Sequence, residues 1–209
     1  MFGPISVILQ DPIIFVVLVG FFLAGLVLHG VTQARLAARL GDPQGVEAGF
    51  GTPEPSVHLG LWSLALYLLL GCGLPRPVPL HLSGRAGLGV QLSGPLLLTL
   101  WALALLLLQH LQVAFATGLD MVGRGLELAA RASVLHALFF LLPLPALDGF
   151  RVLWAVGPRG LRRVLAQGQL AGPLLTYIAW LVLSISGAFA WVQLPVMNAL
   201  KSLYSWLPF

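Results

Sequence analysis

Three side chains that could bind a metal ion or transfer a proton lie inside or beside apolar stretches of the sequence. His29 follows a long run of apolar and Gly residues, and Gln33 lies one helical turn further on, so both occupy one helix face. Asp148 ends a second apolar stretch, in the sequence Leu147-Asp148-Gly149. Such side chains are costly inside an apolar span, so each one marks a candidate functional site.

The same residues also have a structural interpretation. His29 could hydrogen-bond a backbone carbonyl, and Gln33 could face the membrane interface. Asp148 could cap a helix or pair with Arg151. Short motifs have low specificity, so for any one residue taken alone the structural interpretation is the commoner one. A common location for His29 and Asp148 would favour a shared site instead.

The composition indicates that a lipid bilayer surrounds most of this chain. Of its 209 residues, 58% are hydrophobic and only 9% are charged, whereas about 25% of the residues of a soluble domain are charged. The basic residues behind the net charge of +4 are scattered between apolar stretches, which argues against binding to nucleic acid. Leu and Ala dominate, which favours helices over a barrel. We therefore expect an all-α polytopic membrane protein, with residues 1–209 forming a single membrane domain.

Five apolar segments are candidate membrane elements, since a helix needs about 20 residues to cross about 30 Å of hydrocarbon. They cover residues 12–40, 59–72, 90–115, 133–147 and 172–192, and the apolar tail to Phe209 could form a sixth. The segment 59–72 is short, and a proline-rich run follows it. If it does not cross, every Arg except Arg124 and Arg131 shares one side of the membrane, a much stronger bias than the alternative gives.

We therefore interpret the segment 59–72 as a re-entrant or interfacial element. The positive-inside rule then puts the arginine-rich loops in the cytoplasm, as expected in a bacterial cytoplasmic membrane. With this topology the segments 12–40 and 133–147 run in the same direction. His29 and Asp148 are then predicted to lie at the same depth, where they could share a site.

A series of short motifs in this sequence resembles the site-2 protease family of intramembrane zinc metalloproteases, in its short bacterial form. That family carries H-E-x-x-H-A, G-D-P, N-P-x-x-H, K-P-V-P, G-P-L-x-N and N-L-L-P-x-P-x-L-D-G, in this order. The matching stretches here are His29–Ala34, Gly41–Pro43, Glu54–His58, Arg76–Pro79, Gly94–Leu98 and Phe140–Gly149. The resemblance implies a protease-like helical core over residues 29–149, followed by a C-terminal loop and helices over 150–209.

The departures from the family pattern fall on the catalytic positions. In the family the two His and the Asp bind zinc, and the Glu activates the bound water. Here His29 and Asp148 remain, but Gly30 stands at the Glu position and Gln33 at the second His position. Gly30 cannot accept a proton, and an amide oxygen is a poor zinc ligand. Leu98 and Phe140 replace two family Asn residues.

These replacements predict a pseudoprotease with no intact catalytic residue, in which His29 and Asp148 are residual metal ligands and bound zinc is not expected. What remains is a membrane groove that could bind transmembrane helices of client proteins or partner subunits. A strand-like element near the segment 59–72 could also pair with an extended client segment. The residues expected to line the groove are Gln33, Gly94, Pro95, Phe140, Pro143 and Pro145.

Two alternatives stay open at this stage. An active intramembrane metalloendopeptidase could use His29 and Asp148 with a third ligand and a base from the loop that carries Glu47, Glu54 and His58. His136 is excluded from that site because a regular helix would place it about 18 Å from Asp148. A structural subunit of a larger membrane complex is the other alternative, and partners that co-purify at fixed stoichiometry would favour it.

Overall fold

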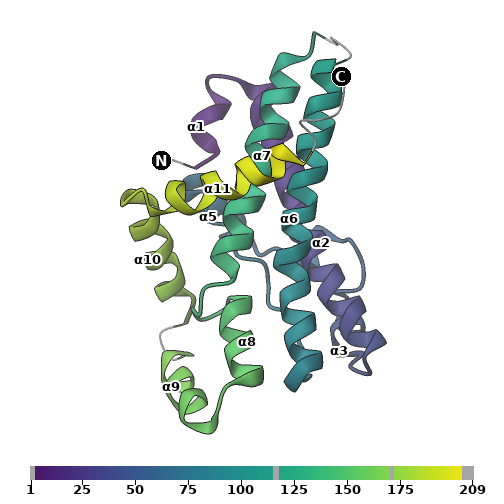
Figure 1. Ribbon diagram of the computed structural model, residues 1–209, viewed down its shortest axis with the longest axis vertical. Helices are drawn as coiled ribbons and strands as arrows, with labels where there is room; N and C mark the ends of the chain where they lie inside the picture. The colour runs from purple at the N-terminus through teal and green to yellow at the C-terminus, as the bar shows by residue number, and fades with distance from the viewer. Residues whose placement is uncertain (1–2, 115–117, 170–171, 204–209) are drawn as a thin grey trace.

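The structure is a computed structural model that describes residues 3–114, 118–169 and 172–203 (Figure 1). Within these ranges the regular structure is entirely helical. The helices are α1 (Ile5–Ile8), α2 (Pro12–Arg39), α3 (Gln44–Glu47), α4 (Pro55–His58), α5 (Leu61–Leu70), α6 (Gly84–Ala114), α7 (Asp120–Phe140), α8 (Asp148–Val156), α9 (Arg159–Gln169), α10 (Gly172–Ile185) and α11 (Ala188–Ser202). The expectation of an all-α protein is confirmed.

Three long helices, α2, α6 and α7, pack against one another and form the core. Helices α2 and α7 run in the same direction and α6 runs opposite to both (Figure 1). Buried Leu18, Leu106 and Leu126 hold the three helices together at one end, and Phe22 and Leu98 lie in a second apolar cluster. The prediction that the segments 12–40 and 133–147 run in the same direction is therefore confirmed.

Two of the described helices, α2 and α6, are long and apolar enough to cross a membrane. A third span arises only if the pair 160–167 and 172–185, bent by 87°, is counted as one. The protein is thus an integral membrane protein by the length and composition of these helices. The predicted five to six membrane segments are not confirmed.

The boundaries of α2 follow from its sequence. The Asp11 carboxylate accepts a hydrogen bond from the Ile14 N–H, at 3.2 Å, and Pro12 occupies the first turn, where its missing N–H costs nothing. The helix ends at Arg39. Gly41 follows with φ of +96°, a conformation that Gly adopts without strain.

The segment 59–72 forms the short helix α5 and then turns back. Gly71, with φ of +73°, ends α5, and residues 71–83 return without helical structure. The Arg76 N–H donates a hydrogen bond to the His58 carbonyl at 2.6 Å, so the two ends of this excursion meet. The chain therefore returns to its starting point, as the interpretation of a re-entrant element requires.

The predicted apolar segment 133–147 is helical only in its first part. Helix α7 ends at Phe140, and Asp148 is the first residue of the separate helix α8. Pro143 and Pro145 explain the break, because proline lacks the N–H for the helical hydrogen bond and disfavours helical geometry in the residue before it. Ala146 completes the turn with φ of +69°.

The predicted segment 172–192 is also divided. Gly187, with φ of +73°, separates α10 from α11, which then crosses α7 (Figure 1). The Lys201 Nζ lies 2.8 Å from the Glu127 Oε1, and the Gln193 amide donates to the Arg131 carbonyl at 2.6 Å. These contacts attach α11 to α7. The end of the predicted sixth segment, residues 204–209, lies outside the described residues.

His136 attaches the returning segment to α7. Its Nε2 accepts a hydrogen bond from the Gly73 N–H at 3.1 Å, and its Nδ1 donates to the Ala132 carbonyl at 2.8 Å. The rings of Phe22 and Trp180 pack against the imidazole, with centroids 4.4 and 4.7 Å away. His136 thus has both ring nitrogens satisfied, and its role is to hold the segment that begins at Gly71.

Replacement of His136 should expose the only cysteine of the chain, Cys72, which is fully buried beside Gly73. His136→Leu leaves the buried Gly73 N–H without an acceptor, a loss of about 1–3 kcal/mol. We expect maleimide to label Cys72 much faster in this variant than in the wild type. His81→Leu, which removes an exposed imidazole, is the control. Equal labelling rates in all three proteins would contradict the role of His136.

Candidate functional site

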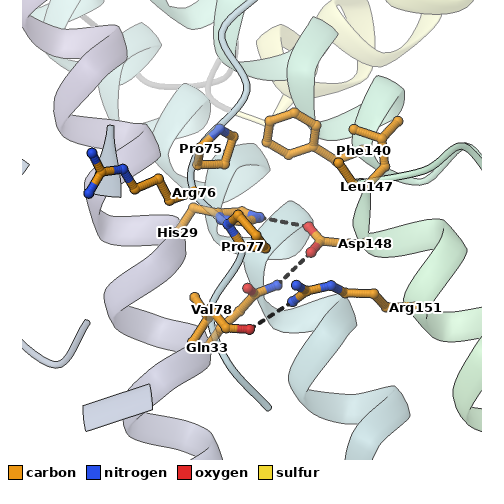
Figure 2. A pocket seen from close by; sticks show the side chains of 11 residues that line it. His29, Gln33, Pro75, Arg76, Pro77, Val78, Phe140, Leu147, Asp148 and Arg151 are labelled. Carbon is orange, nitrogen blue, oxygen red and sulfur yellow. Dashed lines mark hydrogen bonds and ion pairs between the residues drawn. The ribbon is translucent and has the colours of Figure 1, made fainter. Parts of the chain in front are cut away.

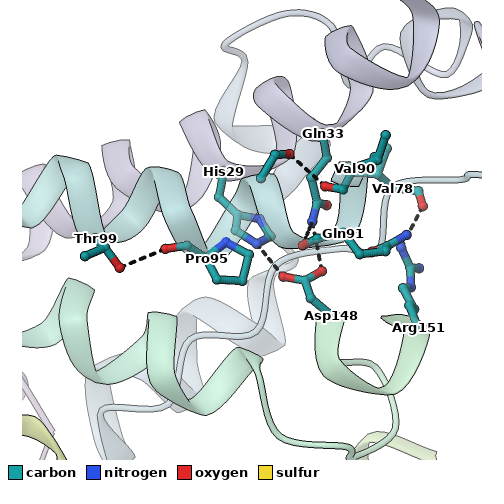
Figure 3. Close-up of polar contacts among 10 residues, drawn as sticks. His29, Gln33, Val78, Val90, Gln91, Pro95, Thr99, Asp148 and Arg151 are labelled. Carbon is teal, nitrogen blue, oxygen red and sulfur yellow. Dashed lines mark hydrogen bonds and ion pairs between the residues drawn. The ribbon is translucent and has the colours of Figure 1, made fainter. Parts of the chain in front are cut away.

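His29, Gln33 and Asp148 meet in one buried hydrogen-bonded group (Figures 2 and 3). The His29 Nε2 lies 2.7 Å from the Asp148 Oδ2, and the Gln33 Nε2 donates to the Asp148 Oδ1 at 2.9 Å. The three residues are only 3%, 1% and 6% exposed. A carboxylate can only accept, so the His29 Nε2 carries the proton of this contact. The structural interpretation is wrong for His29, whose partner is a carboxylate and not a backbone carbonyl, and for Gln33, which is buried.

The orientation of the Gln33 amide follows from its second partner. The same Nε2 donates to the Gln91 carbonyl on α6, at 3.3 Å. Two acceptors around one amide atom identify that atom as nitrogen. Pro95 explains why this carbonyl is available, because proline has no N–H to bond the carbonyl four residues before it. The predicted groove residue Pro95 thus acts through Gln91 (Figure 3), which the sequence analysis did not identify.

Two glycines let this group pack closely. A Cβ on Gly94 would collide with the His29 Nε2 and would lie 2.8 Å from the Gln33 Nε2, so α6 can approach α2 only because residue 94 has no side chain. A Cβ on Gly30 would collide with the His58 Nδ1 and would lie 3.0 Å from its Cε1. The His58 ring therefore occupies the space into which a side chain at position 30 would project.

His58 is held in that position by several contacts. Its Nε2 lies 2.8 Å from the Thr52 carbonyl, and its own carbonyl accepts the Arg76 N–H. The Phe50 ring meets the imidazole edge to face, with centroids 5.3 Å apart. Its Nδ1 is buried and has no hydrogen-bond partner among the described residues. Of the loop residues proposed as a replacement base, the structure brings His58 next to Gly30, whereas Glu47 and Glu54 are exposed.

The extended chain after α5 and the start of α8 close the site. Figure 2 shows Pro75, Pro77 and Phe140 around the His29 and Asp148 side chains. The Arg151 Nη1 donates to the Val78 carbonyl at 3.0 Å and so fixes the extended chain to α8. Burial lowers the pKa of the Arg151 guanidinium, and the nearby Asp148 carboxylate opposes that shift. The cavity left between these residues has a volume of about 10 Å³, the room that one water needs.

The other predicted groove residues lie in different surroundings. Pro145 is buried, and its carbonyl accepts a hydrogen bond from the Thr176 hydroxyl of α10. Pro143 is exposed. Leu98 is fully buried in the apolar core, so an Asn at this position would need a polar partner there. Phe140 packs its ring against His29, with centroids 5.3 Å apart, and lines the site as predicted.

The donor set in this arrangement does not fit a zinc ion. Zinc lies about 2.0–2.2 Å from each nitrogen or oxygen ligand at near-tetrahedral angles, which would hold the two donor atoms more than about 3 Å apart. The His29 Nε2 and the Asp148 Oδ2 instead lie 2.7 Å apart and share a proton. Gln33 directs its NH₂ group, which cannot bind a cation, towards Asp148. No group of three His, Cys, Asp or Glu that could hold a metal occurs among the described residues.

The motifs that carry His29 and Asp148, now found together at one site, resemble those of the site-2-protease-like membrane proteins. A sequence comparison supports this class. Over 185 aligned residues the chain is 31% identical to "Putative zinc metalloprotease YwhC" of Bacillus subtilis (strain 168), with 82% of this chain and 81% of that protein covered. The chain therefore belongs to this metalloprotease family. No family model and no solved structure matches it.

The contact between Gly30 and His58 predicts an unusual response to alanine. Inside a helix, Gly→Ala normally stabilises by up to about 1 kcal/mol. Gly30→Ala should instead destabilise, by about 1–3 kcal/mol, because the new methyl group collides with the His58 ring. Thermal unfolding of the purified protein in detergent measures the effect.

Gly20→Ala is the matched control on α2, since a Cβ at Gly20 would have no atom within 4 Å beyond the adjacent residues and the local helix backbone. Adding His58→Ala to Gly30→Ala should cancel most of the loss in a double-mutant cycle. If Gly30→Ala is as stable as Gly20→Ala, the His58 ring does not fill the position of the missing side chain.

Proposed function

We propose that this protein is a catalytically inactive member of its family, a pseudoprotease of the bacterial cytoplasmic membrane that binds transmembrane helices of client proteins or partner subunits. The contact that carries the proposal is the direct hydrogen bond between the His29 Nε2 and the Asp148 Oδ2. It joins the two residual zinc ligands to each other and leaves no metal position between them.

The surroundings of this hydrogen bond support the same conclusion. Gln33 donates to Asp148 in place of a third metal ligand, and Gly30 offers no base. Removal of a positioned general base typically slows an enzyme by about 10²- to 10⁴-fold. The His58 ring fills the space into which a base at position 30 would project. These features remove hydrolysis while they preserve the helical framework.

The extended chain beside the site supports the binding role. Residues 74–82 run without helical structure past His29 and Asp148, and Arg76 and Pro77 in this stretch are exposed. An extended segment of a client could pair with such a stretch through backbone hydrogen bonds. A client helix that unwinds locally at the site could form its backbone hydrogen bonds with this stretch. Such bonds matter because little water is present at this depth of the membrane.

The zinc content of the full-length protein, purified in detergent, tests the inactive state. Elemental analysis should find far less than one zinc per chain in the wild type and the same amount in Asp148→Ala. Gln33→His should take up zinc, because it completes a set of two imidazoles and one carboxylate. Near-stoichiometric zinc in the wild type that is lost in Asp148→Ala would contradict the proposal.

A specific observation favours the second candidate, an active metalloendopeptidase that uses His58 as its base. The unpartnered Nδ1 of His58 faces Gly30, the position of the base in the family. In that case zinc-loaded wild type would cleave a transmembrane peptide, and His58→Ala would slow the cleavage by about 10²- to 10⁴-fold. If the protein is inactive, as we propose, neither the wild type nor His58→Ala cleaves the peptide.

Photocrosslinking in cells tests the binding role. Benzoylphenylalanine introduced at Arg76, which lines the mouth of the site, should give a protein adduct of discrete mass. The same group at Arg39, an exposed residue at the end of α2 outside the lining of the site, is the control and should not give this adduct. Lipid adducts alone at both positions would contradict a client or partner at the site. A partner that also co-purifies at fixed stoichiometry would identify a permanent subunit.

A further inference from the structure

A second, larger cavity lies beside the site, between the extended chain, the start of α6, α8 and α9. Its volume is about 450 Å³, which lies in the range of small-molecule sites. It shares Pro77, Ala146 and Arg151 with the lining of the first site, but His29 and Asp148 do not line it. The family site therefore does not account for this cavity.

Two arginines line the cavity wall, and the Asp148 carboxylate of the adjoining site interacts with one of them, Arg151. Arg151 and Arg162 both line it, and among the described residues no Asp or Glu does. The Arg151 Nη1 donates to the Val78 carbonyl, and Arg162 donates from Nε to the Gly157 carbonyl at 3.0 Å and from Nη2 to the Ala155 carbonyl at 3.2 Å. A guanidinium has five N–H donors, so both arginines keep donors beyond these contacts.

The fixed position of the two guanidinium groups suits an anion with several oxygens. The backbone contacts hold Arg162 at the junction of α8 and α9 and Arg151 against the extended chain. Planar guanidinium groups bind phosphate through paired hydrogen bonds. Gln91 and Ser83 add uncharged polar side chains to the wall. The shared chemistry of these groups is that of a phosphate site.

The remaining wall indicates which phosphate compound fits. The rings of Phe150 and Trp154 stack with centroids 6.3 Å apart, and Trp154 is 38% exposed. Leu80 and Leu82 add apolar surface to the same cavity. Tryptophan and arginine beside apolar side chains are typical of the headgroup level of a bilayer. A free inorganic phosphate would use none of this apolar surface.

The side chains of helix α9 also indicate the headgroup level of a bilayer. Leu165 is buried against the protein, whereas Arg163 and Val164 beside it are exposed. Exposed basic and apolar side chains next to each other suit the membrane interface, where anionic lipids attract the basic ones. We propose that the cavity binds the phosphate of an anionic phospholipid headgroup, with Arg151 and Arg162 as its ligands.

A charge placed in the cavity wall tests this proposal without loss of the fold. Ser83→Asp adds a carboxylate at an exposed position just before α6, and Ser83→Asn is its uncharged match. Both side chains suit the start of a helix. Phosphatidylglycerol binding to the delipidated full-length protein is measured by native mass spectrometry. We expect Ser83→Asp to weaken binding about tenfold and Ser83→Asn to leave it unchanged.

Two further comparisons separate a built site from general surface charge. Arg162→Gln should weaken phosphatidylglycerol binding, whereas Arg163→Gln on the next, exposed residue should not. Equal losses in the two variants, or equal binding of phosphatidylcholine and phosphatidylglycerol by the wild type, would overturn the proposal. Displacement of the lipid by inorganic phosphate at similar concentration would overturn the assignment to a lipid.

Discussion

A carboxylate inside an apolar helical core needs a partner for each of its oxygens, and the arrangement around Asp148 follows from this need. His29 and Gln33, one turn apart on α2, donate to the two oxygens. This pairing fixes the start of α8 against the middle of the core and therefore the position of the chain between Phe140 and Asp148. Without these donors the buried charge would cost several kcal/mol.

The close approach of three helices makes that pairing feasible. Gly94 removes the side chain that would hold α6 away from α2, and Pro95 leaves the Gln91 carbonyl without a helical partner. Gln33 uses this carbonyl together with Asp148, so one amide joins α2, α6 and α8. The carbonyl that Pro95 leaves without a partner in α6 thus accepts a hydrogen bond from the neighbouring helix α2.

In the pseudoprotease that we propose, the site of the metalloprotease family is a packed and hydrogen-bonded contact. His58 lies where a side chain at position 30 would project, and His29 bonds Asp148 directly. Loss of one residue of the group would leave buried polar atoms without a hydrogen-bond partner. With Gly at position 30 and Gln at position 33, both oxygens of Asp148 keep a partner. The residues at these positions are therefore compatible with a packed helical core. The adjoining cavity, for which we propose a phospholipid headgroup, is built from residues outside those positions.

The sequence by itself determined the class of protein, the direction of the two helices that carry the site, and the meeting of His29 with Asp148. These features depend on the length of apolar segments, on the distribution of arginines and on a long motif. Each of these is a property of neighbouring residues or of a count along the chain. Only the tertiary structure decided that Gln33 donates rather than accepts, and that His58 rather than Glu47 or Glu54 reaches Gly30. These features depend on the distances between side chains of different helices, and no periodicity along the chain records them.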